Sequence, residues 1–391
     1  MNPGAGIQRW TGIICAMIPG LDGLRAIAFL TVLAGHSSDV AFGWMGVQLF
    51  FVLSGFLITG ILIRMKESLP IGEYFKKFYG RRFLRIFPLY YLYLILISLA
   101  IWQKSAIPAQ FLRKELIGVV EPQLSYAYFY IYDLFHASGM FVHTRFLAHL
   151  WSLSVEEQFY IVWPLVLLLT PKEKLKHLFL ACIALGPVLR LAAYFIYDSG
   201  AISAPLGDPY TAIYVLPFSH VDAFAMGALL SQFPVTQPRK QLAILAVLIP
   251  LVGYLTQYLS RGAIRWDTLG YEYRLHVAYK FVWGYSLLNY LFALIIYNVA
   301  RTSLFTRILD SFLFRYLGKI SYGLYVYHYP ITYFVLRIIP DWIPPQQTFL
   351  TDAGVFVITL CTVTIVASLS YYLVEKPIND LKDRFFPIRT P

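Results

Sequence analysis

Three ionisable side chains interrupt an apolar segment near the start of the chain. The segment LDGLRAIAFLTVLAGHSS contains Asp22, Arg25 and His36. On a helix, eleven residues make about three turns, so Arg25 and His36 would face the same way, about 16 Å apart. A base and a cation on one stripe, with an acid beside them, predict a catalytic or binding site. The alternative is an ion pair between Asp22 and Arg25, with His36 at the far helix end.

Carboxylates occur in two other apolar segments. In HLWSLSVEEQFYIVWPL, Glu156 and Tyr160 share a helix face, and Gln158 lies between them. A buried carboxylate needs a cation or its own proton, so this pattern predicts a site or a structural ion pair. Glu157 can fill the same role as Glu156. Asp222 in SHVDAFAMGALLS allows the same two interpretations.

Three arginines precede another apolar segment. Arg81, Arg82 and Arg85 in RRFLRIFPLYY form one cationic patch if the segment begins a helix. Arginine binds phosphate through two parallel hydrogen bonds, so the patch is suited to a phosphorylated ligand. Attraction to anionic lipid at a membrane surface explains the same residues without a ligand.

Two further motifs place polar groups on apolar helices. Tyr322, Tyr325 and His328 recur every three residues in SYGLYVYHYPITYF, which predicts a polar lumen for a ligand or an aromatic belt at a membrane surface. In FFVLSGFLITG, Ser54 and Gly55 predict close helix packing. The same small residues would also let a substrate chain pass close to the backbone.

Composition indicates what must position these residues. Hydrophobic residues make up 58% of the 391, charged residues only 14%, and mean hydropathy is +0.61. A soluble domain is about 25% charged, so an all-α, polytopic membrane protein is predicted. The net charge of +11 fits Lys and Arg in cytoplasmic loops better than nucleic-acid binding. The three separated cysteines offer no metal-ligand spacing, and no metal or permanently bound cofactor is predicted.

Ten segments are long and apolar enough to span a bilayer. They are residues 21–38, 46–64, 84–102, 149–170, 177–197, 211–231, 242–259, 280–300, 317–338 and 350–373. Placing both chain ends in the cytoplasm gives 20 Lys and Arg inside and eight outside, as expected for a membrane protein. The connection 103–148 is predicted to hold re-entrant or interfacial structure.

Three parts of the chain are distinguished by this pattern. Residues 1–20 form an N-terminal extension, which is either cytoplasmic or untranslated because Met1 and Met17 are both candidate starts. Residues 21–377 form the transmembrane domain, and 378–391 form a short cytoplasmic tail.

The motifs together resemble the acyltransferase-3 family of bacterial membrane acyltransferases, which includes O-acetylases of surface polysaccharides and macrolides. The matching pieces are LDGLRAIA with Arg25 and His36, FFVLSGFLITG, RRFLRIFPLYY, WSLSVEEQFYIVWP, HVDAFAMGALL, SYGLYVYHYP and YYLVEKP, in the expected order from Leu21 to Pro377.

The resemblance implies an enzyme of the bacterial inner membrane, with acetyl-CoA or another acyl-CoA as donor. It implies that His36 is catalytic and that Arg25 is its essential partner. Arg81, Arg82 and Arg85 would then meet the coenzyme A phosphates. Glu156 falls on the acidic position of its motif. The family often adds an extracytoplasmic hydrolase-like domain, and without one the acyl group would pass directly, or through another protein, to the acceptor.

The acceptor implied is a hydroxyl of a cell-surface carbohydrate or lipid-linked glycan, or alternatively of a macrolide-type small molecule. Two other functions stay open on the residues alone. A transporter or flippase for a lipid-linked glycan also needs intramembrane charges. A non-catalytic membrane scaffold or sensor would tolerate the loss of His36.

Overall fold

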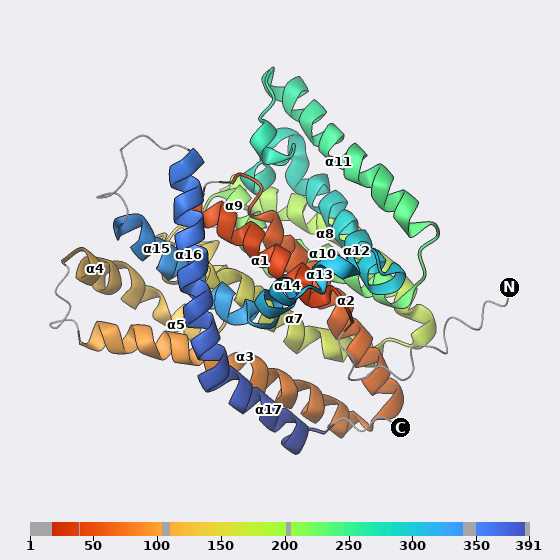
Figure 1. The fold of residues 1–391 in the computed structure, drawn as a ribbon. Helices are drawn as coiled ribbons and strands as arrows, with labels where there is room; N and C mark the ends of the chain where they lie inside the picture. Colours follow the sequence, from red (N-terminus) through yellow and green to blue (C-terminus); the bar gives the residue numbers. More distant parts are fainter. Residues whose placement is uncertain (1–17, 39, 104–109, 201–204, 339–348, 388–391) are drawn as a thin grey trace.

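The described part of the chain is entirely helical in its regular structure. A computed structural model describes residues 18–38, 40–103, 110–200, 205–338 and 349–387, and no strand is found among them. Most of the predicted N-terminal extension, with both candidate start residues, lies outside the described residues. Figure 1 shows the helices in chain order.

The long helices are α1 (Leu21–Ser37), α2 (Met45–Ser68), α3 (Ile71–Trp102), α7 (Leu150–Leu169), α8 (Leu175–Asp198), α11 (Pro238–Arg261), α12 (Lys280–Thr302), α15 (Ser321–Ile338) and α16 (Phe349–Ser370). The shorter ones are α4 (Gln110–Glu115), α5 (Leu124–Tyr128), α6 (Tyr132–His136), α9 (Pro209–Val215), α10 (Val221–Gln232), α13 (Thr306–Leu309), α14 (Phe312–Lys319) and α17 (Lys376–Phe385). One π-helical turn, Tyr371–Glu375, joins α16 to α17, and another, Leu116–Val120, follows α4.

Seven described helices are long and apolar enough to cross a membrane, and the bent pair α9–α10 makes an eighth. The chain is therefore a multi-pass membrane protein. The helices α1 and α15 occupy the two remaining predicted positions, so a helix lies at each of the ten. The count of ten spans and the cytoplasmic placement of both ends stay predictions.

Three predicted spans have different bounds in the structure. Helix α3 begins at Ile71, directly after Pro70, rather than at 84, so Arg81 and Arg82 lie inside the same helix as Arg85 and not before it. The predicted span 211–231 is bent by 65°, where Pro217 cannot continue the helical hydrogen bonds. The predicted span 317–338 is broken at Ile320 into α14 and α15, two residues after the weak helix former Gly318.

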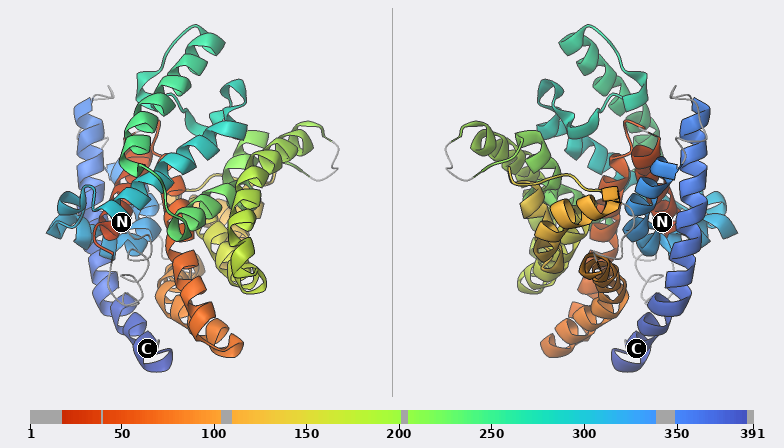
Figure 2. Two further views of the ribbon diagram at one scale, coloured as in Figure 1. Left: turned by 90° about the vertical axis from the view of Figure 1, so that its right-hand side faces the viewer. Right: turned by 90° about the vertical axis from the view of Figure 1, so that its left-hand side faces the viewer.

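The two segments predicted to lie outside the spans are also helical. Residues 110–136 of the long connection form α4, α5 and α6 with turns between them. The predicted C-terminal tail contains most of α17, which packs on α3 through an ion pair of 2.9 Å between Arg81 and Asp383. In Figure 2, α16 and α17 form one long column on the outside of the protein.

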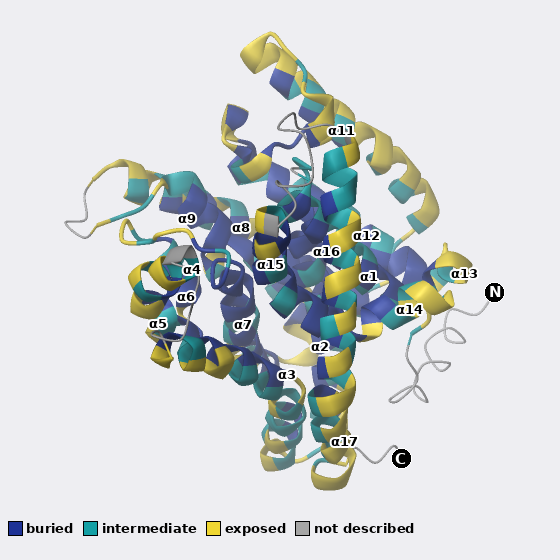
Figure 3. Cartoon of the chain, turned by 60° about the vertical axis from the view of Figure 1, so that its left-hand side comes forward, coloured by how far each residue is buried: buried dark blue, intermediate teal, exposed yellow. Residues whose placement is uncertain are grey.

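The helices α1, α2, α7 and α15 form the buried centre, whereas α3, α11 and α16 are more exposed (Figure 3). Close packing fixes two of these helices. A Cβ at Gly55 of α2 would lie 2.1 Å from the Phe224 carbonyl oxygen of α10, and one at Gly318 of α14 would lie 1.9 Å from that of Asp22. The packing interpretation is therefore correct for Gly55, and α14 is held against the start of α1.

Candidate active site

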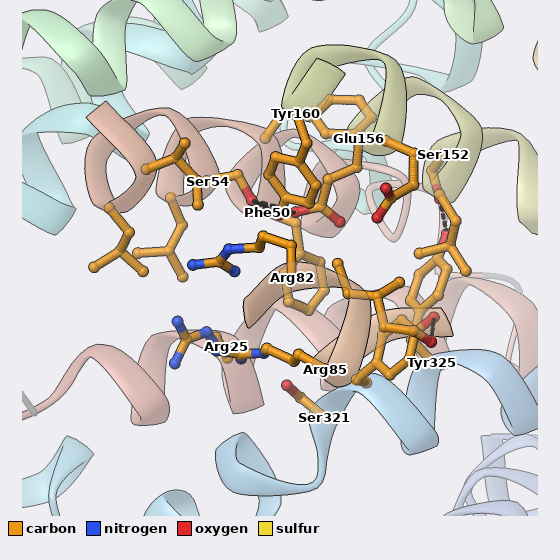
Figure 4. Close-up of a pocket in the computed structure, with 18 of the residues that line it drawn as sticks. Arg25, Phe50, Ser54, Arg82, Arg85, Ser152, Glu156, Tyr160, Ser321 and Tyr325 are labelled. Carbon is orange, nitrogen blue, oxygen red and sulfur yellow. Dashed lines mark hydrogen bonds between the residues drawn. The ribbon is translucent and has the colours of Figure 1, made fainter. Parts of the chain in front are cut away.

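A narrow cavity of about 190 Å³ brings together most of the predicted site residues. It lies where α1, α2, α3, α7 and α15 meet (Figure 4). Eight predicted residues line it: Arg25, Ser54, Arg82, Arg85, Glu156, Tyr160, Tyr322 and Tyr325. The sequence motifs, spread over some 300 residues, thus converge on one space.

One wall of the cavity is organised around Glu156. Its Oε1 accepts hydrogen bonds from the Ser54 hydroxyl of α2 and from the Tyr160 hydroxyl of the next turn of α7. The Arg82 guanidinium lies over the Tyr160 ring, 5.5 Å from its centroid. Glu157 also lines the cavity, but the Ser54 hydroxyl bonds to Glu156.

The opposite wall is cationic. The guanidinium groups of Arg25, Arg82 and Arg85 project into the same space in Figure 4. Arg25 forms an ion pair with Asp22, as one interpretation of the sequence expected. Neither Arg82 nor Arg85 donates a hydrogen bond or forms an ion pair to any residue that the structure describes. Arg82 is half-buried and Arg85 is exposed, and two neighbouring cations without an ion pair favour an anionic ligand.

A wider cavity of about 780 Å³ adjoins the narrow one, and Arg25, Arg85 and Tyr322 line both. Its basic lining residues are Arg25, Arg64, Arg85, Arg301, Arg315, Lys319 and Lys382, and its acidic ones are Asp22 and Glu375. The excess of basic groups again favours an anionic ligand. Arg81 lines neither of these two cavities but a third, of about 210 Å³, together with Arg82 and Arg85.

Beyond the narrow cavity lies a group of histidines. Nδ1 of His36 is 2.8 Å from Nε2 of His328, and Nδ1 of His328 is 2.6 Å from the Tyr325 carbonyl oxygen. Tyr325 also lines the cavity, where its hydroxyl is 2.5 Å from that of Ser152. Tyr325 therefore connects the cavity to His36 through His328.

A proline in α15 explains how a third histidine is held. Pro330 has no N–H, so the carbonyl of Val326, four residues earlier, lacks its helical donor. Nε2 of His149 lies 3.0 Å from that oxygen and donates to it. His149 is buried beside His328, with 5.4 Å between the ring centroids.

Aromatic and cationic groups also contact His36. The Tyr329 ring stacks on His36 with a centroid distance of 4.2 Å. Arg145 donates to the His36 carbonyl oxygen at 3.2 Å and lies over the Tyr329 ring. His143, which is exposed, is 2.9 Å from the Tyr329 hydroxyl. These residues leave His36 half-buried.

Comparison with known proteins agrees with this arrangement. The family described as an acyltransferase domain matches residues 18–372. The chain belongs to this acyltransferase family. No solved structure matches it significantly.

Similar members are named O-acetyltransferases. Peptidoglycan O-acetyltransferase OatA of Listeria monocytogenes is 28% identical over 95% of this chain and 57% of its own length. The putative peptidoglycan O-acetyltransferase YrhL of Bacillus subtilis is 30% identical over 95% of this chain and 56% of its own. The putative O-acetyltransferase SACOL0978 of Staphylococcus aureus is 28% identical over 92% of this chain and 57% of its own length. The chain spans just over half the length of these relatives.

Six predicted site residues do not line the narrow cavity. Asp22 lines the wide cavity, Arg81 lines the third, and His36 and His328 form the histidine group. The other two, Asp222 and Gln158, lie elsewhere in this acyltransferase domain. Asp222 forms a buried ion pair of 2.9 Å with Arg190, which confirms the structural interpretation. Gln158 points the other way around α7 and donates to the Tyr130 carbonyl and to Asp133. The reason is helical geometry, because Gln158 is two residues from Glu156 and so lies on the opposite side of α7.

Sequence reasoning missed several residues around His36. The sequence HTRFLAH places His143, Arg145 and His149 within seven residues, and that density of polar groups before an apolar helix was a usable signal. Tyr329 adjoins a predicted residue. Besides the predicted Arg25 and Arg85, the basic residues of the wide cavity come from α2, α12, α14 and α17. Each alone looks like an ordinary cytoplasmic loop residue.

Within the part of the chain that the structure describes, no group of three or more His, Cys, Asp or Glu residues is placed to hold a metal ion. The chemistry available at the site is that of histidine, arginine, carboxylate and hydroxyl groups.

Proposed function

We propose that this protein transfers an acyl group, most simply acetyl, from acyl-CoA to a hydroxyl of a cell-surface carbohydrate or lipid-linked glycan. One observation carries the proposal. A wide cationic cavity adjoins a narrow arginine-lined one, and Tyr325 of that lining is hydrogen-bonded through His328 to His36. The names of the similar proteins support acetyl as the group and a glycan such as peptidoglycan as the acceptor.

The donor fits the two cavities by charge and shape. Coenzyme A ends in phosphates and continues as a long, neutral thiol-bearing arm. The wide cavity supplies cations for the phosphates, and Arg82 and Arg85 extend them towards the narrow cavity. Apolar residues such as Phe50, Leu57 and Ile86 line the narrow cavity and suit the arm.

The orientation follows from loop charge. With both chain ends in the cytoplasm of a cell's inner membrane, the arginines of α3 face the cytoplasm, where acyl-CoA is made. His36 then lies towards the outer side, where the acceptor enters. Residues Tyr329, Arg145 and His143 surround this entrance.

The proposed chemistry is general-base catalysis. His36 takes the proton from the acceptor hydroxyl, and imidazole is suited to this because it titrates near neutral pH. Arg25 lies three turns from His36 on the same helix and lines both donor cavities, so its role is to orient the donor. Transient acylation of His36 is the other route, and it uses the same residues.

The experiment is transfer of radiolabelled acetyl from acetyl-CoA in membranes that contain the wild type or His36→Ala, followed by fractionation of the products. We expect label in a glycan fraction with the wild type, and a loss of about 100-fold or more with His36→Ala at equal protein amount. A macrolide-type or lipid acceptor would place the label in the organic extract. Equal transfer by both proteins would overturn the role of His36.

A further inference from the structure

The hydrogen bonds around His36 determine which of its nitrogens can act. The Tyr325 carbonyl oxygen can only accept, so His328 must donate to it from Nδ1. The neutral His328 ring then has only a lone pair at Nε2. Because that lone pair faces Nδ1 of His36 at 2.8 Å, His36 must donate from Nδ1. The neutral His36 therefore carries its own lone pair at Nε2.

We propose that His328 is the positioning residue of this acyltransferase, and that it holds His36 in the tautomer whose Nε2 accepts a proton. The inference rests on the proposed function, since it explains how His36 serves as the base. In many enzymes a carboxylate accepts the second ring N–H of the catalytic histidine. Here His328 accepts it, and the Tyr325 carbonyl oxygen in turn accepts from His328. It orients the chain of two rings without adding a negative charge at membrane depth.

Packing makes His328 difficult to replace with water. It is 0% exposed, and the Phe29 and His149 rings lie nearly perpendicular to it, at centroid distances of 5.9 and 5.4 Å. The His36 and His328 rings are nearly parallel, with 8° between their planes. His36 itself keeps part of its surface exposed, as a group that meets an acceptor must.

The proton and the acyl group balance in this scheme. Nε2 of His36 takes the proton of the acceptor hydroxyl while the hydroxyl oxygen bonds to the acyl carbon of the thioester. The carbon–sulfur bond breaks, and the coenzyme leaves as a thiolate that takes the proton from Nε2. His328 keeps its own Nδ1 proton throughout and touches neither substrate. It therefore acts only by fixing the tautomer and orientation of His36.

Two amide substitutions test the role. His328→Gln places a carbonyl oxygen near the original Nε2, where it can accept from His36. His328→Asn is one methylene shorter and reaches only the original Nδ1 position. We expect His328→Asn to lower kcat for acetyl transfer about 100-fold, with little change in the acetyl-CoA KM. His328→Gln should stay within about 10-fold of the wild type.

The matched control is Thr332→Val, one turn further along α15. Thr332 is 0% exposed, and among the described residues its hydroxyl bonds only to the His328 carbonyl oxygen, so this variant should keep the wild-type kcat. Rates are taken per folded protein, measured by size-exclusion chromatography in detergent.

The proposal is overturned if His328→Asn and His328→Gln have the same kcat, or if the loss lies in KM. An absence of acetyl transfer by the wild type would instead overturn the proposed function. The two failures are therefore distinguishable.

Discussion

Arg190 on the one hand, and Arg82 and Arg85 on the other, belong to the same helical bundle. They differ in whether other residues compensate their charge. Arg190 is 0% exposed and pairs with Asp222, with 2.9 Å between Nη1 and Oδ1 and 2.9 Å between Nη2 and Oδ2. The same guanidinium donates to the Ser219 and Val282 carbonyl oxygens and to Ser286. Arg82 and Arg85 make no such bonds to the described residues, although both line the narrow cavity.

The difference separates structural charge from charge kept for a ligand. A charge inside a membrane protein is stable when its hydrogen bonds are made, as those of Arg190 largely are. A charge beside a cavity with its donors unused is ready to bind an anion. The comparison therefore predicts that removing the first kind affects folding, and that removing the second affects binding.

The largest effect is expected at the buried pair. Asp222→Asn leaves the Arg190 charge buried without its counter-ion, which costs about 3–5 kcal/mol of stability. We expect little folded protein in detergent extracts, measured by fluorescence-detected size-exclusion chromatography. The double variant Arg190→Met with Asp222→Leu should recover part of the folded protein, because both charges are then gone. A well-folded Asp222→Asn protein that has lost transfer would instead place Asp222 in the active site.

A smaller effect, on binding alone, is expected at the cavity. Arg85→Gln should raise the acetyl-CoA KM about 10-fold or more, since a charged hydrogen bond to phosphate contributes about 1.5–3 kcal/mol. The amount of folded protein should not change. Arg384→Gln is the control, because Arg384 is exposed and lines none of the three cavities. An unchanged KM in Arg85→Gln would assign this arginine to membrane anchoring.

The sequence predicted the helices and most of the cavity, but not which polar residue had which role. Apolar segments of about 20 residues mark spans because the bilayer imposes that length, and a helix lies at each predicted position. Asp222 and Glu156 looked alike because each is one carboxylate in an apolar run. Their partners, Arg190 for one and Ser54 for the other, are 32 and 102 residues away. Such long-range contacts carry no local pattern.

The effects of the prolines on the helices could be predicted only in part from the neighbouring sequence. Pro217 could have predicted the break between α9 and α10, since proline cannot donate within a helix. The hydrogen bond from His149 to Val326 depends on Pro330 together with a residue from another helix. The proline marks a free carbonyl in the sequence, and only the fold shows which donor fills it.

The buried carboxylate of Asp133 is partly hydrogen-bonded, unlike Arg190 on one side and Arg82 and Arg85 on the other. Its substitution is expected to have the smallest effect on the protein. Asp133 of α6 accepts one hydrogen bond from Gln158, at 2.9 Å, while its Oδ2 has no partner among the described residues. Burial raises the pKa of Asp133 to about 7, from an ordinary value of 3.8. The folded protein therefore binds this proton more tightly than the unfolded chain does. Ionisation of Asp133 therefore does not lower the free energy of unfolding below about pH 4. The destabilisation grows as the pH rises from there to about 7.

Asp133→Asn removes this cost while keeping the shape of the side chain. We expect its thermal unfolding midpoint to exceed that of the wild type by roughly a few degrees at pH 8, and the gain to disappear near pH 4. The measurement is thermal unfolding in detergent across that pH range. A gain that is the same at every pH would mean that the pKa of Asp133 does not change on folding. The distinction between satisfied and unsatisfied buried charge would then hold only for the arginines.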